Sequence, residues 1–302
     1  MLPRSALAAA RMSIVATTGM IADAARVVGG DLADVRALMG PGVDPHAYRQ
    51  TRSDIVAMTR ADLILYHGLH LEAQMTDILA DIGRRRTVTA VADLPAEDLL
   101  ADQDYDGRFD PHVWMVPELW VQVVDRIVTA MAQVQPDHAA AFEANRDAYD
   151  QELRDLGDYA RSVLTTVPEE SRILITAHDA FSYFGAAYGF DVEGIQGIST
   201  ESEAGLNRIA ELVDLLVSRK VGAVFVESSV SDRSIRALIE GAAAQGHEVR
   251  VGGELFSDAM GQDGTYEGTY LGMIDHNVTT IAGALGGTVP SGGRLGKLVQ
   301  GA

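Results

Sequence analysis

The sequence contains no cysteine, and this absence removes several kinds of chemistry at once. Disulfide bonds, thiolate metal sites and thiol nucleophiles are all excluded. No stretch approaches the run of about 18 apolar residues that a membrane-spanning helix needs. Basic residues are also scarce, with 24 Lys and Arg against 43 Asp and Glu and a formal charge of −19. A surface this acidic repels phosphate backbones, so we expect no nucleic-acid partner.

The N-terminus resembles the end of a secretory leader. In MLPRSALAAARM, one arginine precedes a short Ala- and Leu-rich stretch with small residues in an A-x-A-like arrangement. The stretch is too short for a complete hydrophobic region. We interpret residues 1–12 as a signal-peptide remnant or a disordered segment, and we predict an exported, periplasmic protein. The alternative is the frayed terminus of a cytosolic protein.

Short β-branched runs alternate with helical patterns, which is typical of βα units with parallel sheets. In the first half, strands are predicted near 13–17, 35–39, 63–66 and 87–91, and helices near 21–28, 53–60, 72–84 and 117–134. In the second half, strands are predicted near 172–176, 191–194, 223–226 and 248–251, and helices near 181–188, 206–217, 234–244 and 266–285. The predicted fold class is α/β, with two lobes that each contain a mainly parallel sheet flanked by helices.

The segment between the halves has a different composition. It is rich in Ala, Glu, Asp and Arg and carries no strand signal; Asp137 can cap it and Pro168 can end it. We predict one long helix that joins the lobes rigidly, because a helix is stiffer than a Gly/Ser linker. The predicted domains are therefore an N-terminal lobe at 13–135, a linker helix at 136–168, a C-terminal lobe at 169–286 and a flexible Gly-rich tail at 287–302.

One short motif occurs twice, as DPHAY at 44–48 and as DPHVW at 110–114. Proline fixes its own φ and favours an extended conformation in the aspartate before it, so His46 and His112 are each presented on a constrained loop. A single histidine in such a loop is more often a turn or surface residue. Two copies in one chain favour a pair of metal ligands.

Two further candidate ligands come from the second half. His178 follows a predicted buried strand in RILITAHDAFSYF, and Asp258 follows another in GGELFSDAMG. Taken singly, a core histidine and a helix-capping aspartate are the simpler interpretations. Open α/β sheets, however, bind ligands beyond the carboxyl ends of their strands, where the two lobes would face each other. His46, His112, His178 and Asp258 then form a four-ligand N/O site for one divalent transition-metal ion.

Neighbouring carboxylates are candidates for holding the second ring nitrogens of these histidines. They are Asp44, Asp110, Asp179 and Glu227. Glu201 and Glu203 are expected to cap a helix or to face solvent. Four aromatic residues either shield the site from water or belong to the ordinary core: Tyr48, Trp114, Phe181 and Tyr183.

These motifs together resemble the metal-binding solute-binding proteins of ABC transporters, in their TroA-like (cluster A-I), zinc- and manganese-capturing group. The resemblance covers roughly Ser13 to Leu285 and includes both DPH motifs, TAHDAFSYFGAAYGF, ISTESEAGLNRIAELV, VFVESSVSDRSI and the closing Asp258. The ligand spacings of 66, 66 and 80 residues match the three-histidine, one-aspartate pattern of the family. The resemblance implies two lobes on a helical backbone, one ion at their interface and delivery of that ion to a membrane permease.

Departures from the family pattern bear on the metal. Many zinc-specific relatives carry a His-rich loop before the second ligand, whereas PAEDLLADQDYDGRFD is acidic and free of histidine. Three imidazoles favour zinc, the missing loop is compatible with manganese, and Fe²⁺ is a further candidate. His67 stands where relatives often have asparagine; with His70 it forms either an auxiliary metal site or two ordinary loop histidines. The chain shows no lipobox cysteine, which favours the soluble periplasmic form.

Three alternatives to a monomeric, non-enzymatic metal carrier are open. A metal-dependent hydrolase needs an open metal position and a general base, and the chain has no HExxH, H-x-H, P-loop or GxGxxG motif. A cell-adhesion protein, the label that some family members carry, would need an exposed adhesive surface or a repeat array. A binder of a chelate such as a siderophore or corrinoid would need a wide pocket and no converging histidines.

The sequence also leads to a hypothesis for capture. The ion enters between the lobes, is taken by His46 and His112, and is then enclosed by His178 and Asp258. Because neutral imidazoles are required, affinity should fall as the pH drops through the histidine range of roughly 6.5. With a rigid linker helix, capture should order local loops more than it closes the lobes.

Overall fold

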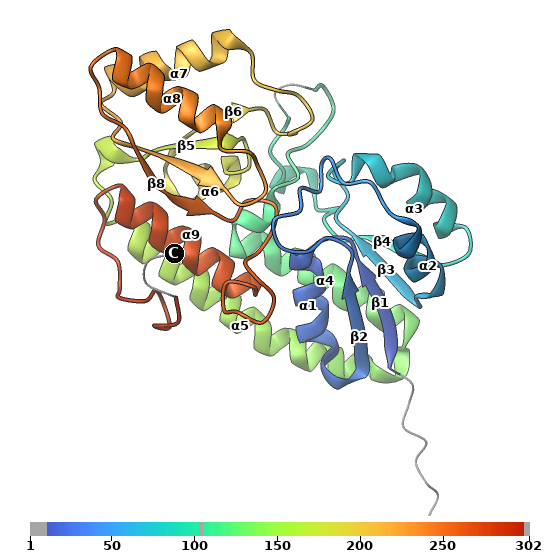
Figure 1. Cartoon of the computed structure of the whole chain (residues 1–302). Coiled ribbons are helices and arrows are strands. Elements are labelled where there is room, and N and C mark those ends of the chain that lie inside the picture. The colour runs from blue at the N-terminus through green and yellow to red at the C-terminus, as the bar shows by residue number, and fades with distance from the viewer. Residues whose placement is uncertain (1–10, 103–104, 299–302) are drawn as a thin grey trace, which may run out of the picture.

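The computed structural model describes residues 11–102 and 105–298, which form two α/β lobes side by side with a long helix beneath both (Figure 1). Each lobe has parallel strands flanked by helices, so the predicted fold class is confirmed. Most of the predicted leader remnant lies outside the described residues. Of its last two residues, Arg11 precedes the first strand and Met12 begins it.

The first lobe is built on a four-stranded parallel sheet in the order β2-β1-β3-β4. Its strands are β1 (Met12–Ala16), β2 (Ala33–Ala37), β3 (Leu63–Tyr66) and β4 (Thr87–Ala90). Its helices are α1 (Gly19–Gly29), α2 (Arg52–Arg60), α3 (Thr76–Gly83) and α4 (Pro117–Val134). Side chains alternate between the two faces of a strand. Thus Ile14 packs in the core beneath α1 and α4, and Val15 packs in the separate cluster beneath α2 and α3.

The second lobe repeats this arrangement. Strand β5 (Ile173–His178) pairs with β6 (Asp191–Gln196), β7 (Ala223–Glu227) pairs with β8 (Arg250–Leu255), and β5 lies beside β7. The resulting order, β6-β5-β7-β8, is that of the first lobe. Helices α7 (Leu206–Ser218) and α8 (Arg233–Ala244) cover one face, while α6 (Ser182–Tyr188) and α9 (Tyr270–Ala284) belong to the side of the shared core.

Strand ends differ from the prediction where glycine interrupts the β pattern. The prediction ended β8 at Val251, but the strand continues through Gly252 and Gly253 to Leu255. A Cβ at Gly252 would lie 2.7 Å from Cε1 of Phe225, so the close packing against β7 requires glycine there. Helix α9 begins at Tyr270 and not at 266, because the Thr269 hydroxyl caps it by accepting from the Gly272 N–H.

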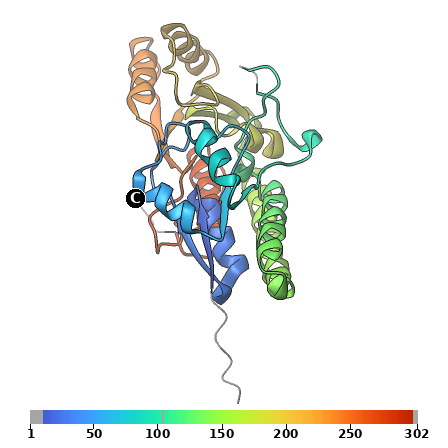
Figure 2. The ribbon, with the colours of Figure 1, turned by 90° about the vertical axis from the view of Figure 1, so that its right-hand side faces the viewer.

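The connecting helix is α5 (Ala139–Leu164), which has 26 residues. It packs against α1, α4 and α9, and both views show it running along one side of the molecule (Figures 1 and 2). Asp137 was predicted to cap it, but this residue lies in a short 3₁₀ turn, Pro136–His138, that precedes the helix. The helix ends before Pro168, where the Thr165 hydroxyl donates to the Arg161 carbonyl.

The two lobes also share a hydrophobic core. One continuous cluster contains buried residues of α1, α4, α5 and α9 together with residues of both sheets. Trp120 of α4 stacks on Tyr270 of α9, with ring centroids 5.0 Å apart and planes 14° apart. Both side chains are fully buried. The lobes are therefore joined by shared packing and not by α5 alone.

The predicted flexible tail is described as far as residue 298. This part lies against the second lobe: the Arg294 N–H donates to the Asp275 carboxylate, and the Thr288 N–H donates to Thr166 Oγ1. Its Gly-rich composition did not predict these contacts. Within the described part of the chain, no helix combines the length and apolarity needed to span a membrane.

Candidate metal centre

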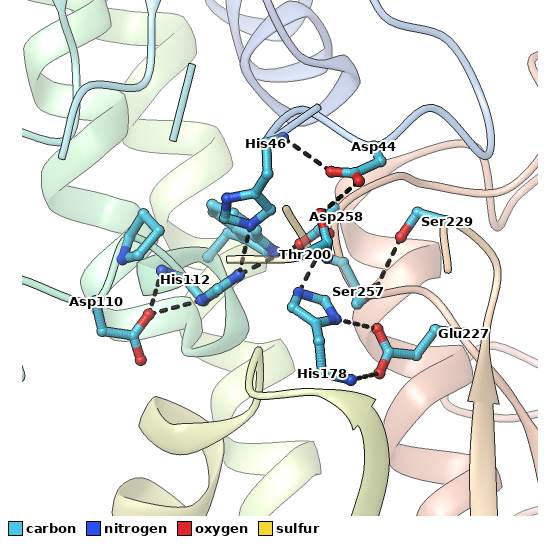
Figure 3. A network of polar contacts seen from close by, with 12 residues as sticks. Asp44, His46, Asp110, His112, His178, Thr200, Glu227, Ser229, Ser257 and Asp258 are labelled. Atoms are coloured by element: carbon cyan, nitrogen blue, oxygen red, sulfur yellow. Dashed lines mark hydrogen bonds and ion pairs between the residues drawn. The ribbon is translucent and has the colours of Figure 1, made fainter. Parts of the chain in front are cut away.

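The four predicted ligands meet at the interface of the two lobes, at the carboxyl ends of four strands (Figure 3). His46 lies in the loop after β2, His112 in the loop after β4 and Asp258 in the loop after β8. His178 was expected in a loop beyond Thr176. It is instead the last residue of β5, because the strand continues its pairing with β6 as far as Gln196.

The facing atoms are spaced as ligands of one small ion would be. One nitrogen or oxygen from each of the four residues lies within 4.8 Å of the others. The Nε2 atoms of His46 and His112 are 3.4 Å apart. Asp258 Oδ1 lies 3.4 Å from His112 Nε2, and its Oδ2 lies 3.3 Å from His178 Nε2. In a tetrahedral zinc site with bonds of about 2.0–2.1 Å, neighbouring ligand atoms are about 3.3–3.4 Å apart.

Several polar atoms in this cluster are buried without a hydrogen-bond partner. They are both carboxylate oxygens of Asp258 and Nε2 of His178. The two side chains have no exposed area, and buried polar groups are normally hydrogen-bonded. The Asp258 oxygens face Nε2 of His112 and Nε2 of His178 across the cluster at 3.4 and 3.3 Å without a well-aligned hydrogen bond. The residues therefore fit a single metal ion, which would satisfy these atoms together.

The two DPH motifs fold into the same local turn but use the aspartate differently. Asp44 Oδ1 accepts the backbone N–H of His46 at 2.8 Å, and Asp110 Oδ1 accepts that of His112 at 2.9 Å. Asp110 Oδ1 also lies 2.7 Å from Nδ1 of His112, which holds the ring and directs Nε2 to the cluster. Asp44 Oδ2 instead accepts the Thr200 hydroxyl of the second lobe at 2.6 Å.

Glu227 positions His178 from the end of the neighbouring strand β7. One carboxylate oxygen accepts the His178 N–H at 2.9 Å, and the other lies 2.5 Å from Nδ1. Asp179 was, like Glu227, a candidate for holding a ring nitrogen, but its carboxylate accepts the Ser182 hydroxyl at the start of α6. Strand β7 lies beside β5, so the ends of the two strands are neighbours, and this makes Glu227 the partner of the ring.

The electrostatics divide the histidines into two kinds. Burial lowers the pKa of His46 to about 3. Burial also lowers the pKa of His112, but the charge and hydrogen bond of Asp110, with Asp258, outweigh this and raise it to about 9. In the same way, Asp258 and Glu227 outweigh burial and raise the pKa of His178 well above its usual value. Without an ion, His46 is therefore neutral and the other two rings are protonated.

The carboxylate of Asp258 is kept in its charged form by these two rings. Burial alone would raise its pKa, but the nearby His178 and His112 outweigh burial and hold the pKa well below the usual range. The metal-free cluster thus carries one carboxylate between two imidazoliums. A divalent cation bound here would take the place of the protons on these two rings.

The predicted aromatic wall is only partly present. The Trp114 ring lies 5.1 Å from that of His112, and its Nε1–H donates to the Ser257 carbonyl. Tyr183 is close by through its hydroxyl, which donates to the Asp110 carbonyl. Phe181 packs against Phe184, and the Tyr48 hydroxyl donates to Asp54. Trp114 is therefore the aromatic side chain that shields the cluster.

His67 and His70 do not form a second metal group in the described residues. His67 is buried, its Nε2 lies 2.6 Å from the Pro111 carbonyl, and its backbone N–H donates to Glu72. His70 is exposed. His67 thus supports the His112 loop. Neither Glu72 nor Thr200 was singled out from the sequence. Glu72 also accepts the hydroxyl of Thr17, 55 residues away, and Thr200 donates to Asp44, 156 residues away.

The family model described as zinc-uptake complex component A, periplasmic, matches residues 14–284. The chain is 48% identical to the manganese-binding lipoprotein MntA of Bacillus subtilis over 275 residues, covering 91% of this chain and 90% of that protein. It is 43% identical to the zinc-binding protein TroA of Treponema pallidum over 283 residues, covering 93% and 91%. The solved structure of periplasmic TroA from Treponema pallidum superposes with a TM-score of 0.89, covering 91% of this chain and 99% of that one.

Proposed function

The chain belongs to the family of periplasmic zinc-uptake complex component A proteins, and we propose that it captures one zinc or manganese ion for import by an ABC transporter. The observation that carries the proposal is the buried cluster of three imidazoles and one carboxylate with unpartnered atoms that face one another across it. The proposed ligands are His46, His112, His178 and Asp258. Relatives named as manganese- and zinc-binding proteins support the same class of cargo.

The geometry favours a bare ion over a chelate. The four ligand residues are at most 3% exposed, and one donor atom from each lies within 4.8 Å of the others, with three contacts at 3.3–3.4 Å. This spacing leaves room for one ion and none for a siderophore or corrinoid. It also argues against a metal-dependent hydrolase, because four protein ligands leave no open tetrahedral position for a reactive water. We therefore propose a carrier and not an enzyme.

The relatives guide the finer proposals about location and partner. Family members are described as periplasmic or as lipoproteins, and we propose an exported protein that hands its ion to a membrane permease. We propose that it acts as a monomer, since both halves of the metal cluster come from one chain. The domain boundaries remain those proposed from the sequence: lobes at 13–135 and 169–286 joined through 136–168.

Two features of the site bear on which ion it binds: one favours zinc and the other favours manganese. Donor spacings of 3.3–3.4 Å suit the short bonds of zinc, and imidazole is a preferred zinc ligand. Asp258 turns one oxygen to each of two histidines, so it can bind through both oxygens, and carboxylate oxygen suits manganese. We propose that zinc binds more tightly and that manganese also binds.

Two carboxylates orient the ligand histidines toward the ion. Asp110 and Glu227 accept the Nδ1–H groups of His112 and His178, which leaves Nε2 of each ring as the donor to the ion. When the ion is bound, each of these rings gives up its Nε2 proton to solvent. Trp114 covers the cluster and excludes water beside His112.

Metal content and affinity test the proposal. The purified protein, stripped and reloaded, should bind one zinc or manganese ion per chain by elemental analysis and calorimetry. His112→Ala and Asp258→Ala should each lose tight binding, while Asp179→Asn, which alters a neighbouring carboxylate outside the cluster, should retain it. If the unaltered protein bound no divalent ion, the proposed function would be wrong. If both ligand variants bound normally, the ligand set would be wrong.

A further inference from the structure

The interface between the lobes is held differently at its two edges. At the His112 edge, three buried aromatic side chains make hydrogen bonds across the interface. Tyr183 donates to the Asp110 carbonyl, Trp114 to the Ser257 carbonyl, and Tyr270 to the Trp114 carbonyl, at 2.9, 2.8 and 2.8 Å. Each of the three side chains is at most 3% exposed. The loop that carries His112 is therefore fixed to the second lobe by buried packing.

The His46 edge has much weaker attachments. In the described part of the chain, the loop at 38–51 is hydrogen-bonded to the second lobe through the half-buried contact between Thr200 Oγ1 and Asp44 Oδ2. We call this pair the rim contact. The Ser228 carbonyl also lies beside the loop, 3.3 Å from where a Cβ on Gly42 would be, but it makes packing only. Beside the rim contact, Gln74 of the first lobe donates to Glu201 of the second, but this contact is exposed.

The ligand side chains also differ in how firmly they are held. The rings of His112 and His178 are held through Nδ1 by buried carboxylates, and both face the oxygens of Asp258. For His46, the neighbouring carboxylate contacts the backbone and not the ring. Three ligands are therefore positioned whether or not the 38–51 loop is closed. The position of His46 instead depends on the 38–51 loop that carries it.

A polar cavity of about 300 Å³ lies at this weak edge. Both residues of the rim contact line it, together with Glu203, Ser229 and Arg233. Two carboxylates and several hydroxyl groups make the lining suited to a hydrated cation. A second cavity of about 300 Å³ reaches Asp258, but Arg26 and Arg36 stand in its lining beside Asp263. Of the two routes, the cavity at the rim contact has the more favourable charge for an entering cation.

We propose that Thr200 is a positioning residue: its hydrogen bond to Asp44 holds the His46 loop closed, and the ion enters and leaves through the adjoining polar cavity when this bond opens. The inference rests on the proposed function and deepens it. It also revises the order of capture expected from the sequence. His112, His178 and Asp258 receive the ion first, and His46 closes over it last.

Zinc release from the loaded protein tests this proposal. Release is followed by stopped-flow mixing with an excess of a colorimetric chelator. Thr200→Val keeps the size and branching of the side chain and removes the hydroxyl, so release should become about tenfold faster, which is a modest value for a charge-assisted hydrogen bond. Thr200→Ser restores the hydroxyl and should restore slow release. The melting temperature of the metal-free protein should be the same in both variants, because the bond is at the rim.

A matched substitution and a second variant complete the design. Thr129→Val makes the same change on the exposed face of α4 and should leave release unchanged. His46→Ala should speed release while leaving the association rate constant near that of the unaltered protein, because the other ligands meet the ion first. If Thr200→Val released zinc within twofold of the unaltered protein, or if His46→Ala slowed association, the inference would be overturned. If the unaltered protein bound no ion, the proposed function itself would fail.

Discussion

The two DPH motifs share their sequence and their turn, yet they support two different kinds of ligand. In each, the aspartate accepts the backbone N–H two residues later. Asp110 also holds the ring of His112, and buried aromatic side chains fix that loop to the second lobe. Asp44 reaches instead to Thr200 across the interface. The same motif therefore gives one ligand that is held in place and one that is held only while the interface is closed.

This difference shows that a repeated motif specifies a turn and not the environment of its side chains. The proline and aspartate act locally, over three residues. What distinguishes His112 from His46 comes from elsewhere in the chain: the Pro111 carbonyl meets His67, and Trp114 meets Ser257. A ligand that is fixed before the ion arrives and a ligand that binds last are useful together, because a metal carrier must hold its ion tightly and still release it.

The largest expected effect is the loss of zinc affinity when a ligand histidine is replaced by alanine. His112→Ala should weaken zinc affinity more than His46→Ala, because it removes a ligand whose position is already fixed. Removal of a residue that only orients a ligand typically costs about 10–100-fold, so loss of His112 itself should exceed about 100-fold. Isothermal titration under chelator competition measures both variants. Equal losses would remove the distinction between the two motifs.

The pH dependence of metal affinity should distinguish His112 from His46. At neutral pH the metal must displace protons from His112 and His178, whose pKa values are raised, whereas His46 is already neutral. Affinity should therefore rise by about 10- to 100-fold per pH unit between pH 7 and 9. His46→Ala should keep this slope, and His112→Ala should lose about one proton from it. A slope that vanishes above the usual histidine range of roughly 6.5 would contradict the raised pKa values.

The stability of the metal-free protein should change in the opposite direction. The folded pKa of His112 is raised from 6.5 to about 9, so its contribution is complete below pH 6.5 and is lost as the pH rises through 9. The melting temperature without metal should fall over this window, while metal affinity increases. Thermal melts at fixed ionic strength measure this, with Asp110→Asn as a variant in which the fall should be smaller.

A smaller effect is expected from the two aspartates. Asp110→Asn weakens the hold on Nδ1 of His112 and should lower equilibrium affinity by about 10–100-fold. Asp44→Asn leaves the ring of His46 untouched, since Asp44 contacts the backbone, and should change affinity less. Competition titrations on the pair give the comparison directly. A larger loss in Asp44→Asn would mean that the rim contact determines affinity more than ring orientation does.

The smallest expected effect is a loss of stability at the His112 edge of the interface. The Tyr183 hydroxyl accepts the Leu100 N–H and donates to the Asp110 carbonyl, and both partners lose a hydrogen bond in Tyr183→Phe. The free energy of unfolding should fall by about 1 kcal/mol. That corresponds to a fall of about 1–2 °C in melting temperature for a chain of this size. Thr200→Val at the other edge should leave the melting temperature unchanged.

Local patterns predicted much of this molecule because they act over short distances. The limits of β3 and α4 follow from a β-branched run and from Pro117 at a helix start. The four clustered residues follow from paired motifs and from the rule that ligands bind at the carboxyl ends of parallel strands. Their role as ligands stays a prediction until metal binding is measured.

Other features required the fold because their partners are far apart along the chain. Glu227 contacts His178 through the adjacency of β5 and β7, and Thr200 contacts Asp44 across the interface. Asp179 is the nearer carboxylate to His178 along the chain, but β5 ends at His178, and the Asp179 carboxylate accepts the Ser182 hydroxyl. The ends of β8 and α9 were missed because Gly252 and Thr269 act through packing and capping that periodicity does not encode.

The core shared by the lobes has a consequence for how the molecule unfolds. Residues of α1, α4, α5 and α9 bury one another across the boundary, with Trp120 stacked on Tyr270 at its centre. Neither lobe can lose its packing without exposing apolar surface of the other. The chain should therefore melt as one cooperative unit in calorimetry, and either lobe expressed separately should be insoluble or unfolded.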